Sequence, residues 1–193
     1  MQRIILASGS PQRKSIFSVL NIPFEAIPAD IDEKAIRDDD LKKQAEKIAR
    51  AKAEAVASEN KGIVIAADTF VVLRGQVLEK PKDLAEAEEM LKLQSGQPAV
   101  VYTGFCYLDG EKGINFSTTS TIDIEFRELS AAEIKDYVNK FPVTGWSAAF
   151  SSAYPYGVTL ISQINGSLTG FTYGLPLDLM IPLLRQSGFD VHP

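Results

Sequence analysis

Histidine and cysteine are almost absent from this 193-residue chain, which holds one of each, His192 and Cys106. A disulfide framework needs paired cysteines, and a metal site built from several imidazole or thiolate ligands needs more of both residues. His192 is next to last in the sequence, where chains commonly fray, so a Ser-His-Asp triad is disfavoured as well. Chemistry must therefore use carboxylates, lysines, arginines, hydroxyls or a hard metal ion held by oxygen.

Long apolar runs and an excess of positive charge are also missing. We find no stretch of membrane-spanning length and no secretory signal, so we expect a soluble, cytoplasmic protein that does not enter a membrane. The formal net charge of −5 disfavours broad binding to nucleic acid or to a membrane surface, which needs a basic surface. With 45% hydrophobic residues, the chain can form one sizeable domain, or two lobes that share a cleft, without disulfides.

Alternating strand and helix patterns predict an α/β domain around a mixed sheet. The expected strands cover about residues 4–7, 63–73, 77–80, 99–108, 116–126 and 158–164, with an extended segment over 24–28. The expected helices cover about residues 11–20, 39–59, 84–93, 131–138 and 176–186. Asp83 is expected to cap the third of these helices, and Ser130 and Glu133 to form a capping box at the start of the fourth. Residues 144–157 and 165–174 have the composition of loops. The first helix is expected to bury Ile16, Phe17, Val19 and Leu20.

Residues 6–14, Leu-Ala-Ser-Gly-Ser-Pro-Gln-Arg-Lys, run from a strand through a small loop into a helix whose first turn carries Arg13 and Lys14. Ser10 suits the N-cap and Pro11 the first helical position. A helix N-terminus has unpaired N–H groups and a partial positive charge, so a bound phosphate or carboxylate would favour two cations there. Ordinary solvated cations at this position are the alternative.

Three further charged residues lie where packing alone would not place them. Asp68 interrupts the apolar run of residues 63–73, where a carboxylate is costly unless it is paired, bonded to backbone amides at a bulge, or bound to metal. Lys52 falls on the apolar stripe of the helix over 39–59, and the alternative is that it extends to solvent. Lys80 precedes Pro81 and by itself is an ordinary lysine at the end of a strand.

Together these residues indicate a site that handles phosphate. Arg13, Lys52 and Lys80 would neutralise a polyphosphate, while Asp68 and Glu33 could hold Mg²⁺ or orient a water nucleophile. A solvated acidic loop is the alternative interpretation of the stretch around Glu33. Neither a Walker pattern nor a dinucleotide-binding glycine pattern is present, so phosphate would be held differently from those classes.

The chain resembles the Maf nucleoside triphosphate pyrophosphatases, once described as septum formation inhibitors. The resemblance covers nearly the whole chain and rests on the order and spacing of a series of short motifs. The motifs are Leu6-Ala-Ser-Gly-Ser-Pro-Gln-Arg13, Ile31-Asp-Glu33, Ala51-Lys-Ala53, Ala67-Asp-Thr69, Lys80-Pro81, Ser95-Gly96, Tyr102-Thr-Gly104, Phe126-Arg127, Glu133-Ile134, Tyr137-Val138 and Gly174-Leu-Pro176. Each motif is weak alone, and the ordered set is specific.

The resemblance implies a mixed α/β fold, similar to Maf and ITPase proteins, in which residues 1–193 form one domain of two lobes around a deep cleft. It also implies a protein that is often a homodimer, and hydrolysis of a nucleoside triphosphate to its monophosphate and pyrophosphate with Mg²⁺ or Mn²⁺. Asp68 matches the residue proposed as proton acceptor in that family. The residues that match the phosphate- and metal-handling set are Glu33, Lys52, Lys80, Ser8 and Arg13.

Substrate choice is less clearly encoded, because two of three specificity positions depart from the family pattern. Thr69 follows the pattern of pyrimidine-type members. Gln12 stands where those members usually have a second arginine and the branch acting on 7-methyl-GTP has Trp. The usual Asp-Lys-Ala-Gly-Ala-Tyr segment, followed by Gln, is replaced around residues 145–150, and Ser152 is the nearest match to that Gln. The candidate substrate contacts are Ser8, Ser10, Gln12, Thr69 and Ser152.

The leading prediction is therefore a nucleoside triphosphate pyrophosphatase acting on dTTP and UTP or on related modified pyrimidine nucleotides. One alternative is the same chemistry on a modified purine such as 7-methyl-GTP, with Trp146 and its aromatic loop against the base. A second alternative is a nucleotide-binding regulator of cell division with little activity. The loss of an arginine at Gln12 and of a lysine near residue 145 motivates this last interpretation.

Overall fold

A computed structural model describes residues 2–191, so His192 lies outside the described part of the chain. The strands are β1 (Ile4–Leu6), β2 (Glu25–Ala26), β3 (Ile63–Leu73), β4 (Gln76–Leu78), β5 (Pro98–Asp109), β6 (Ile114–Phe126) and β7 (Ile161–Asn165). The α-helices are α1 (Pro11–Ser18), α2 (Leu41–Glu59), α3 (Leu84–Gln94), α4 (Ala131–Lys140), α5 (Pro155–Val158), α6 (Leu168–Tyr173) and α7 (Leu177–Gln186). Three 3-10 helices are η1 (Glu33–Ala35), η2 (Val143–Gly145) and η3 (Ser147–Ala149).

The strands form one seven-stranded sheet in the order β2-β1-β3-β5-β6-β7, and β4 pairs with β3. β1 is parallel to both β2 and β3, whereas β4 is antiparallel to β3 and β7 is antiparallel to β6. The sheet is therefore mixed, and the predicted α/β class is confirmed. Among residues 2–191, no helix is long and apolar enough to cross a bilayer.

The chain divides into two compact units. Unit 1 contains Met1–Thr69, Thr103–Ser120 and Thr169–Pro193, and unit 2 contains Phe70–Tyr102 and Thr121–Leu168. Strands β3, β5 and β6 each begin in one unit and end in the other. The organisation as one domain with a shared cleft stays a prediction.

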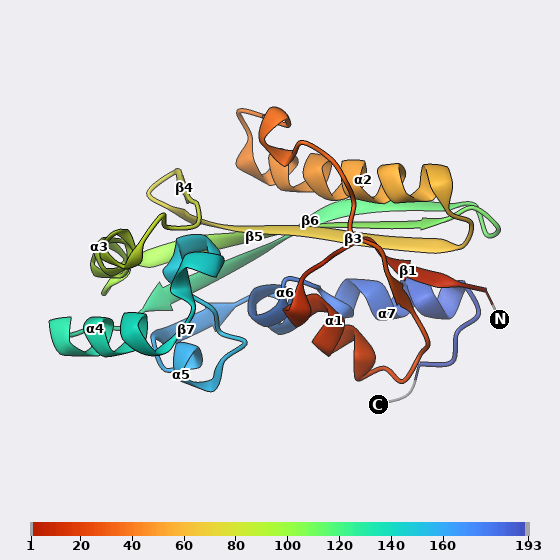
Figure 1. Ribbon diagram of the computed structural model, residues 1–193. Helices are drawn as coiled ribbons and strands as arrows, with labels where there is room; N and C mark the ends of the chain where they lie inside the picture. Colours follow the sequence, from red (N-terminus) through yellow and green to blue (C-terminus); the bar gives the residue numbers. More distant parts are fainter. Residues whose placement is uncertain (1, 192–193) are drawn as a thin grey trace. The chain divides into compact units, whose positions relative to one another are not determined.

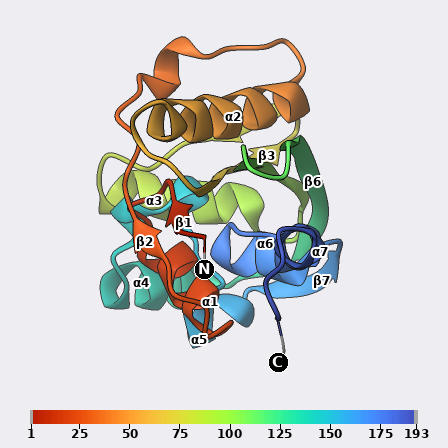
Figure 2. The same cartoon turned by 90° about the vertical axis from the view of Figure 1, so that its right-hand side faces the viewer.

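Unit 1 has a helix layer on each face of its strands, with α2 on one face and α1 and α7 on the other (Figures 1 and 2). Because successive side chains of a strand point to opposite faces, each strand contributes alternate residues to the two layers. The layer containing α1 and α7 includes Ile4, Leu6, Ile63, Ile65, Ala67, Phe17, Met180 and Leu184. The α2 layer includes Ile5, Ala7, Val64, Ala66, Ala49, Ala53 and Val56.

The same alternation positions the polar end of β3. Ala66 packs on the α2 face and Ala67 on the opposite face, so Asp68 is directed toward α2 and Thr69 toward the face of α1. The predicted span of this strand, residues 63–73, is confirmed. Its apolar run therefore delivers two polar side chains to opposite faces at consecutive positions.

Helix α2 begins after Asp40, whose carboxylate accepts hydrogen bonds from the backbone N–H groups of Lys42 at 2.9 Å and Lys43 at 3.4 Å. An N-cap carboxylate satisfies N–H groups that have no partner inside the helix. The predicted apolar stripe is confirmed, and Lys52 is buried within it.

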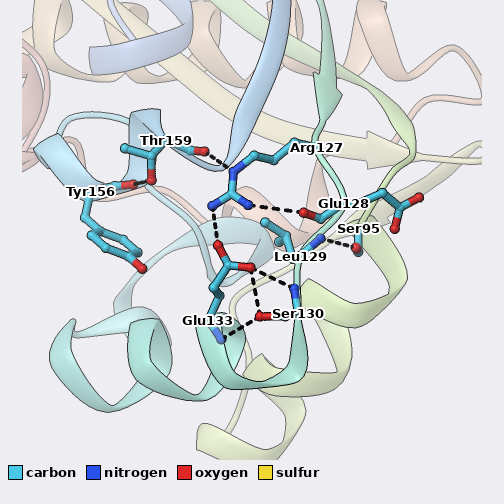
Figure 3. Close-up of polar contacts among 8 residues, drawn as sticks. All are labelled: Ser95, Arg127, Glu128, Leu129, Ser130, Glu133, Tyr156 and Thr159. Atoms are coloured by element: carbon cyan, nitrogen blue, oxygen red, sulfur yellow. Dashed lines mark hydrogen bonds and ion pairs between the residues drawn. The ribbon is translucent and has the colours of Figure 1, made fainter.

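Unit 2 contains two helices whose caps were predicted. Asp83 caps α3 by accepting from Glu86 N at 2.8 Å, and Ser130 and Glu133 form the predicted capping box at the start of α4. Figure 3 shows how Arg127 extends this box: its Nη2 donates to Glu133 Oε1 at 2.7 Å, and its Nε donates to the carbonyl of Thr159 at 2.5 Å. The side chain thus joins the end of β6 to α4 and to the residue that follows α5.

Three details of the predicted elements are wrong. Val19 is exposed and Ile16 only half-buried, whereas Phe17 and Leu20 are buried as predicted; α1 itself ends at Ser18. The strand expected over 158–164 begins only at Ile161, since residues before it form the short helix α5, which starts at Pro155. The expected loop over 165–174 contains α6 (Leu168–Tyr173), a short helix with a glycine at its third position.

Candidate functional site

Asp68 and Glu33 converge on the ammonium group of Lys52. The Nζ atom lies 2.8 Å from Asp68 Oδ1 and 2.8 Å from Glu33 Oε2. The side chains of Lys52 and Asp68 are only 10% and 13% exposed, whereas that of Glu33 is 49% exposed. These three residues, called the Lys52 cluster below, join α2, β3 and η1 within unit 1.

The Lys52 cluster decides between the alternative interpretations of its members. Lys52 does not extend to solvent, because its ammonium group is buried against two carboxylates. Within the described chain, Asp68 is paired with this lysine and makes no bond to a backbone amide. Glu33 is not merely a solvated acid, although half of its side chain is exposed. One positive and two negative charges leave the cluster with one negative charge.

Arg13 is held in a different way, by neutral acceptors. Its Nε donates to the carbonyl of Gly174 at 2.9 Å, its Nη1 to Ser8 Oγ at 3.2 Å, and its Nη2 to Thr69 Oγ1 at 3.3 Å. A guanidinium has five N–H donors in a planar fork, so within the described part of the chain two N–H groups of Arg13 are left for a ligand. Arg13 and these three partners are called the Arg13 cradle below, and all belong to unit 1.

Among residues 2–191, no carboxylate forms a direct ion pair with Arg13. Burial lowers the pKa of this guanidinium, while the carboxylates of Asp68 and Glu33 act in the opposite direction. Arginine nevertheless stays protonated at neutral pH. The cradle therefore presents a fixed positive charge close enough to the Lys52 cluster to feel its carboxylates.

The loop before α1 completes the surroundings of Arg13. Ser8 is buried, and its hydroxyl oxygen accepts from Ser10 N and Arg13 Nη1, each at 3.2 Å. Ser10 caps the helix by accepting from Arg13 N at 3.4 Å, and its own hydroxyl donates to Gln12 Oε1 at 3.0 Å. With Oε1 engaged, Gln12 retains the two donors of its Nε2 group. Lys14, the second cation predicted in this turn, is half-buried.

Two residues of this region were missed as site residues in the sequence. Gly174 supplies the carbonyl for Arg13 from a position 161 residues away, and Thr103, buried on β5, lies 3.2 Å from the hydroxyl of Thr69. The signals for Thr103 are a hydroxyl within the apolar run of residues 99–108 and the motif Tyr102-Thr-Gly104. Gly174 adopts φ +66°, and a Cβ there would lie 2.8 Å from Thr69 Oγ1 and 3.2 Å from Arg13 Nη2.

A divalent metal ion fits the carboxylates of the Lys52 cluster. Among residues 2–191, no group of three or more His, Cys, Asp or Glu side chains could hold a metal ion. Mg²⁺ is commonly bound by only one or two carboxylates together with substrate phosphates, so a full protein cage is not required. Glu33 and Asp68 each engage Lys52 through one oxygen, and the second oxygen of each is the ligand that a metal would use.

The remaining predicted site residues belong to unit 2. Lys80 is exposed between β4 and Pro81, and Ser152 is buried. The hydroxyl of Ser152 has no hydrogen-bond partner among the described residues. Trp146 packs against Tyr154 with ring centroids 4.7 Å apart, so its ring contributes to the packing of the aromatic segment.

Comparison with known proteins identifies the family of this chain. A family model described as Maf-like protein matches residues 3–187. The chain belongs to the Maf-like protein family. A dTTP/UTP pyrophosphatase from Ruminiclostridium cellulolyticum is 35% identical over 188 residues, 96% of each chain. A second one, from Aquifex aeolicus, is 37% identical over 185 residues, 95% of each chain.

A relative with another substrate is similar over the same length. A 7-methyl-GTP pyrophosphatase from Colwellia psychrerythraea is 31% identical over 192 residues, which cover 99% of this Maf-like protein and 96% of the relative. Relatives named for pyrimidine and for methylated purine substrates therefore both align over the full length. Overall similarity alone does not fix the base.

Proposed function

We propose that this Maf-like protein is a nucleoside triphosphate pyrophosphatase that hydrolyses dTTP and UTP to the monophosphate and pyrophosphate. The observation that carries the proposal is that Asp68 and Thr69 are consecutive residues of β3. Asp68 belongs to the Lys52 cluster and Thr69 contacts Arg13, so β3 places the carboxylates close to a guanidinium with open donors. The names of its relatives support the reaction class.

The protein groups divide the work of the reaction. The two open N–H groups of Arg13 and the hydroxyl of Ser8 donate to phosphate oxygens, since the lone pairs of Ser8 are already used and its proton is available. Asp68 accepts a proton from the attacking water. The water oxygen bonds to the α-phosphorus, the bond from that phosphorus to the bridging oxygen breaks, and pyrophosphate leaves.

Glu33 and Asp68 would hold a divalent metal ion, Mg²⁺ or Mn²⁺. When bound, such an ion supplies charge neutralisation for the phosphate oxygens. Lys52 keeps the two carboxylates together, because its ammonium contacts both at 2.8 Å. This arrangement orients Asp68 toward the face of α2.

Substrate choice is assigned to Gln12, Thr69 and Ser152. Thr69 supports a pyrimidine, following the family pattern, and Gln12 offers two neutral donors through Nε2. Lys80 is assigned to phosphate, and Ser152 to the base. The roles of Lys80 and Ser152 rest on the resemblance to the family, and the unpaired buried hydroxyl of Ser152 supports a polar contact there.

A panel of canonical and modified triphosphates, assayed with Mg²⁺ or Mn²⁺ in water enriched in ¹⁸O, tests the proposal. We expect dTTP and UTP to give monophosphate and pyrophosphate in equal amounts, with the label in the monophosphate. A preference for 7-methyl-GTP would overturn the assigned substrate and retain the reaction. Binding of nucleotide without turnover of any triphosphate would overturn the enzyme assignment and favour a regulator.

A further inference from the structure

Thr103 has no role in the mechanism above, yet its hydroxyl lies between Thr69, a partner of Arg13, and the carbonyl of Gly170 in unit 1. The residue is fully buried on β5, and its Oγ1 donates to the carbonyl of Gly170 at 3.0 Å. A carbonyl oxygen can only accept, so the single proton of Thr103 is committed to Gly170. The contact of 3.2 Å between Thr103 Oγ1 and Thr69 Oγ1 must then use the proton of Thr69.

The opposite end of this chain of hydrogen bonds is fixed as well. Arg13 Nη2 is 3.3 Å from Thr69 Oγ1, and a guanidinium can only donate. A pure donor at one end and a pure acceptor at the other impose one direction, from Arg13 to Thr69, from Thr69 to Thr103, and from Thr103 to Gly170. The rotation of the Thr69 hydroxyl is therefore locked, with a lone pair facing Arg13.

The two hydroxyls that contact Arg13 consequently differ in what they can offer a ligand. Ser8 accepts two N–H donors and keeps its proton. The hydroxyl proton of Thr69 is engaged in the hydrogen bond to Thr103, so the Thr69 hydroxyl can only accept and cannot donate to a phosphate oxygen. Toward the phosphates of a triphosphate, Thr69 therefore contributes only its contact with Arg13.

The segment of residues 170–174 supplies two carbonyl acceptors that act on the guanidinium of Arg13, one at Nε and one through Thr69 and Thr103 at Nη2. The carbonyl of Gly174 binds Nε directly, and the carbonyl of Gly170, four residues earlier, ends the chain that begins at Nη2. Ser8 completes the set at Nη1. The guanidinium plane is thereby fixed at three of its nitrogens.

We propose that Thr103 is a positioning residue, which orients Arg13 for phosphate by committing the Thr69 hydroxyl as an acceptor. The inference rests on the proposed function for its effect on turnover, and on the geometry of the free protein for the orientation of Arg13. Thr103→Val removes the hydroxyl at nearly constant volume, and Thr103→Ser restores it. Thr119→Val is the matched control, because Thr119 is also buried and donates to a carbonyl, that of Lys42, at 2.8 Å.

The first measurement is the rate of rotation about the Nε–Cζ bond of Arg13, from ¹⁵N exchange NMR on protein labelled at arginine and assigned with Arg13→Lys. We expect Thr103→Val to speed this rotation about tenfold, as for the loss of one hydrogen bond, and Thr103→Ser and Thr119→Val to leave it unchanged. Unchanged rotation in Thr103→Val, or equal acceleration in Thr119→Val, overturns the proposal. This result does not depend on any turnover.

The second measurement is steady-state hydrolysis of dTTP. Thr103→Val should lower kcat about fivefold while KM changes less than about twofold, since the charge of Arg13 remains and its orientation is lost. Thr103→Ser should recover kcat. If Thr103→Val does not fold, Thr103→Cys, a weaker donor of similar size, carries the same two tests. Faster rotation without turnover of any triphosphate by the wild type would refute the proposed function and retain the positioning of Arg13.

Discussion

Lys52 and Arg13 lie in the same compact unit, yet their surroundings are opposite. Lys52 is buried against two carboxylates at 2.8 Å, so its charge is neutralised inside the protein. Arg13 contacts two hydroxyls and a carbonyl, so its charge is held in place without being neutralised. The comparison teaches that one cation organises carboxylates, while the other remains available to an anion.

The largest expected effect concerns the carboxylate of the Lys52 cluster. Asp68→Asn removes the proton acceptor and keeps the shape, so kcat for dTTP should fall by about 10²- to 10⁴-fold. Nucleotide binding should persist, because the Arg13 cradle is intact. Pyrophosphate release under single-turnover conditions measures the step directly, and an unchanged rate would show that Asp68 is not the base.

The next effect is on stability, and it compares the loss of a buried lysine with the loss of an exposed lysine on the same helix, α2. Lys52→Met leaves Asp68 without its partner and should lower the free energy of unfolding by about 3 kcal/mol. Lys47→Met is the control: Lys47 pairs with Asp38 and is 55% exposed, so its loss should cost less than about 1 kcal/mol. Urea unfolding of both variants gives the values, and equal losses would contradict the distinction.

A smaller effect concerns the cradle. Gly174→Ala places a methyl group 2.8 Å from Thr69 Oγ1 at φ +66°, so both unfolding free energy and kcat/KM should fall. Gly113→Ala has the same φ of +66° with open space around the added carbon. It should lose only the backbone part of the stability, about 1 kcal/mol. Full activity in Gly174→Ala would show that Arg13 tolerates displacement.

The smallest effect lies in an ion pair outside both clusters. Hydrogen bonds from Arg127, and then from the backbone and side chain of Ser130, lower the pKa of Glu133 from 4.5 to about 2 (Figure 3). Because the folded-state pKa is depressed, the stabilisation is present above pH 4.5 and is lost as the pH falls toward 2.

Glu133→Gln should therefore lower the Tm at neutral pH and flatten its decline between pH 4.5 and pH 2. Glu128→Gln is the control, since the carboxylate of Glu128 points away from Arg127 in Figure 3. Thermal unfolding followed by circular dichroism across this range is the measurement. Parallel Tm profiles for wild type and Glu133→Gln would contradict the assignment.

Local sequence rules predicted the elements whose signals are local. The apolar run of residues 63–73, the cap at Asp83 and the capping box of Ser130 and Glu133 are all confirmed. Helix α6 was missed, because Gly170 weakens a six-residue helix that depends on tertiary contacts. Pro155, at the first position of α5, was a start signal that the aromatic composition concealed.

The same limit applies to the site. Lys52 and Asp68 could be found because each breaks an apolar pattern, and the structure pairs them. Ser8 and Thr69 were predicted as site residues, but their contacts with Arg13 were not. Gly174 was not predicted as a site residue, since a carbonyl oxygen carries no sequence signature and Gly174 lies 161 residues from Arg13. Consequently an anion site was predicted at the start of the helix, whereas the contacts that orient the Arg13 side chain are seen only in the fold.

The most direct test of the contrast compares two guanidinium groups as ligands for inorganic pyrophosphate, measured by calorimetry in the presence of a chelator. Arg13 has neutral partners, whereas Arg127 is paired with Glu133 at 2.7 Å. We predict that Arg13→Gln weakens binding about tenfold or more, and that Arg127→Gln leaves the Kd within about twofold. Unchanged affinity in Arg13→Gln, or an equal loss in Arg127→Gln, would contradict the account.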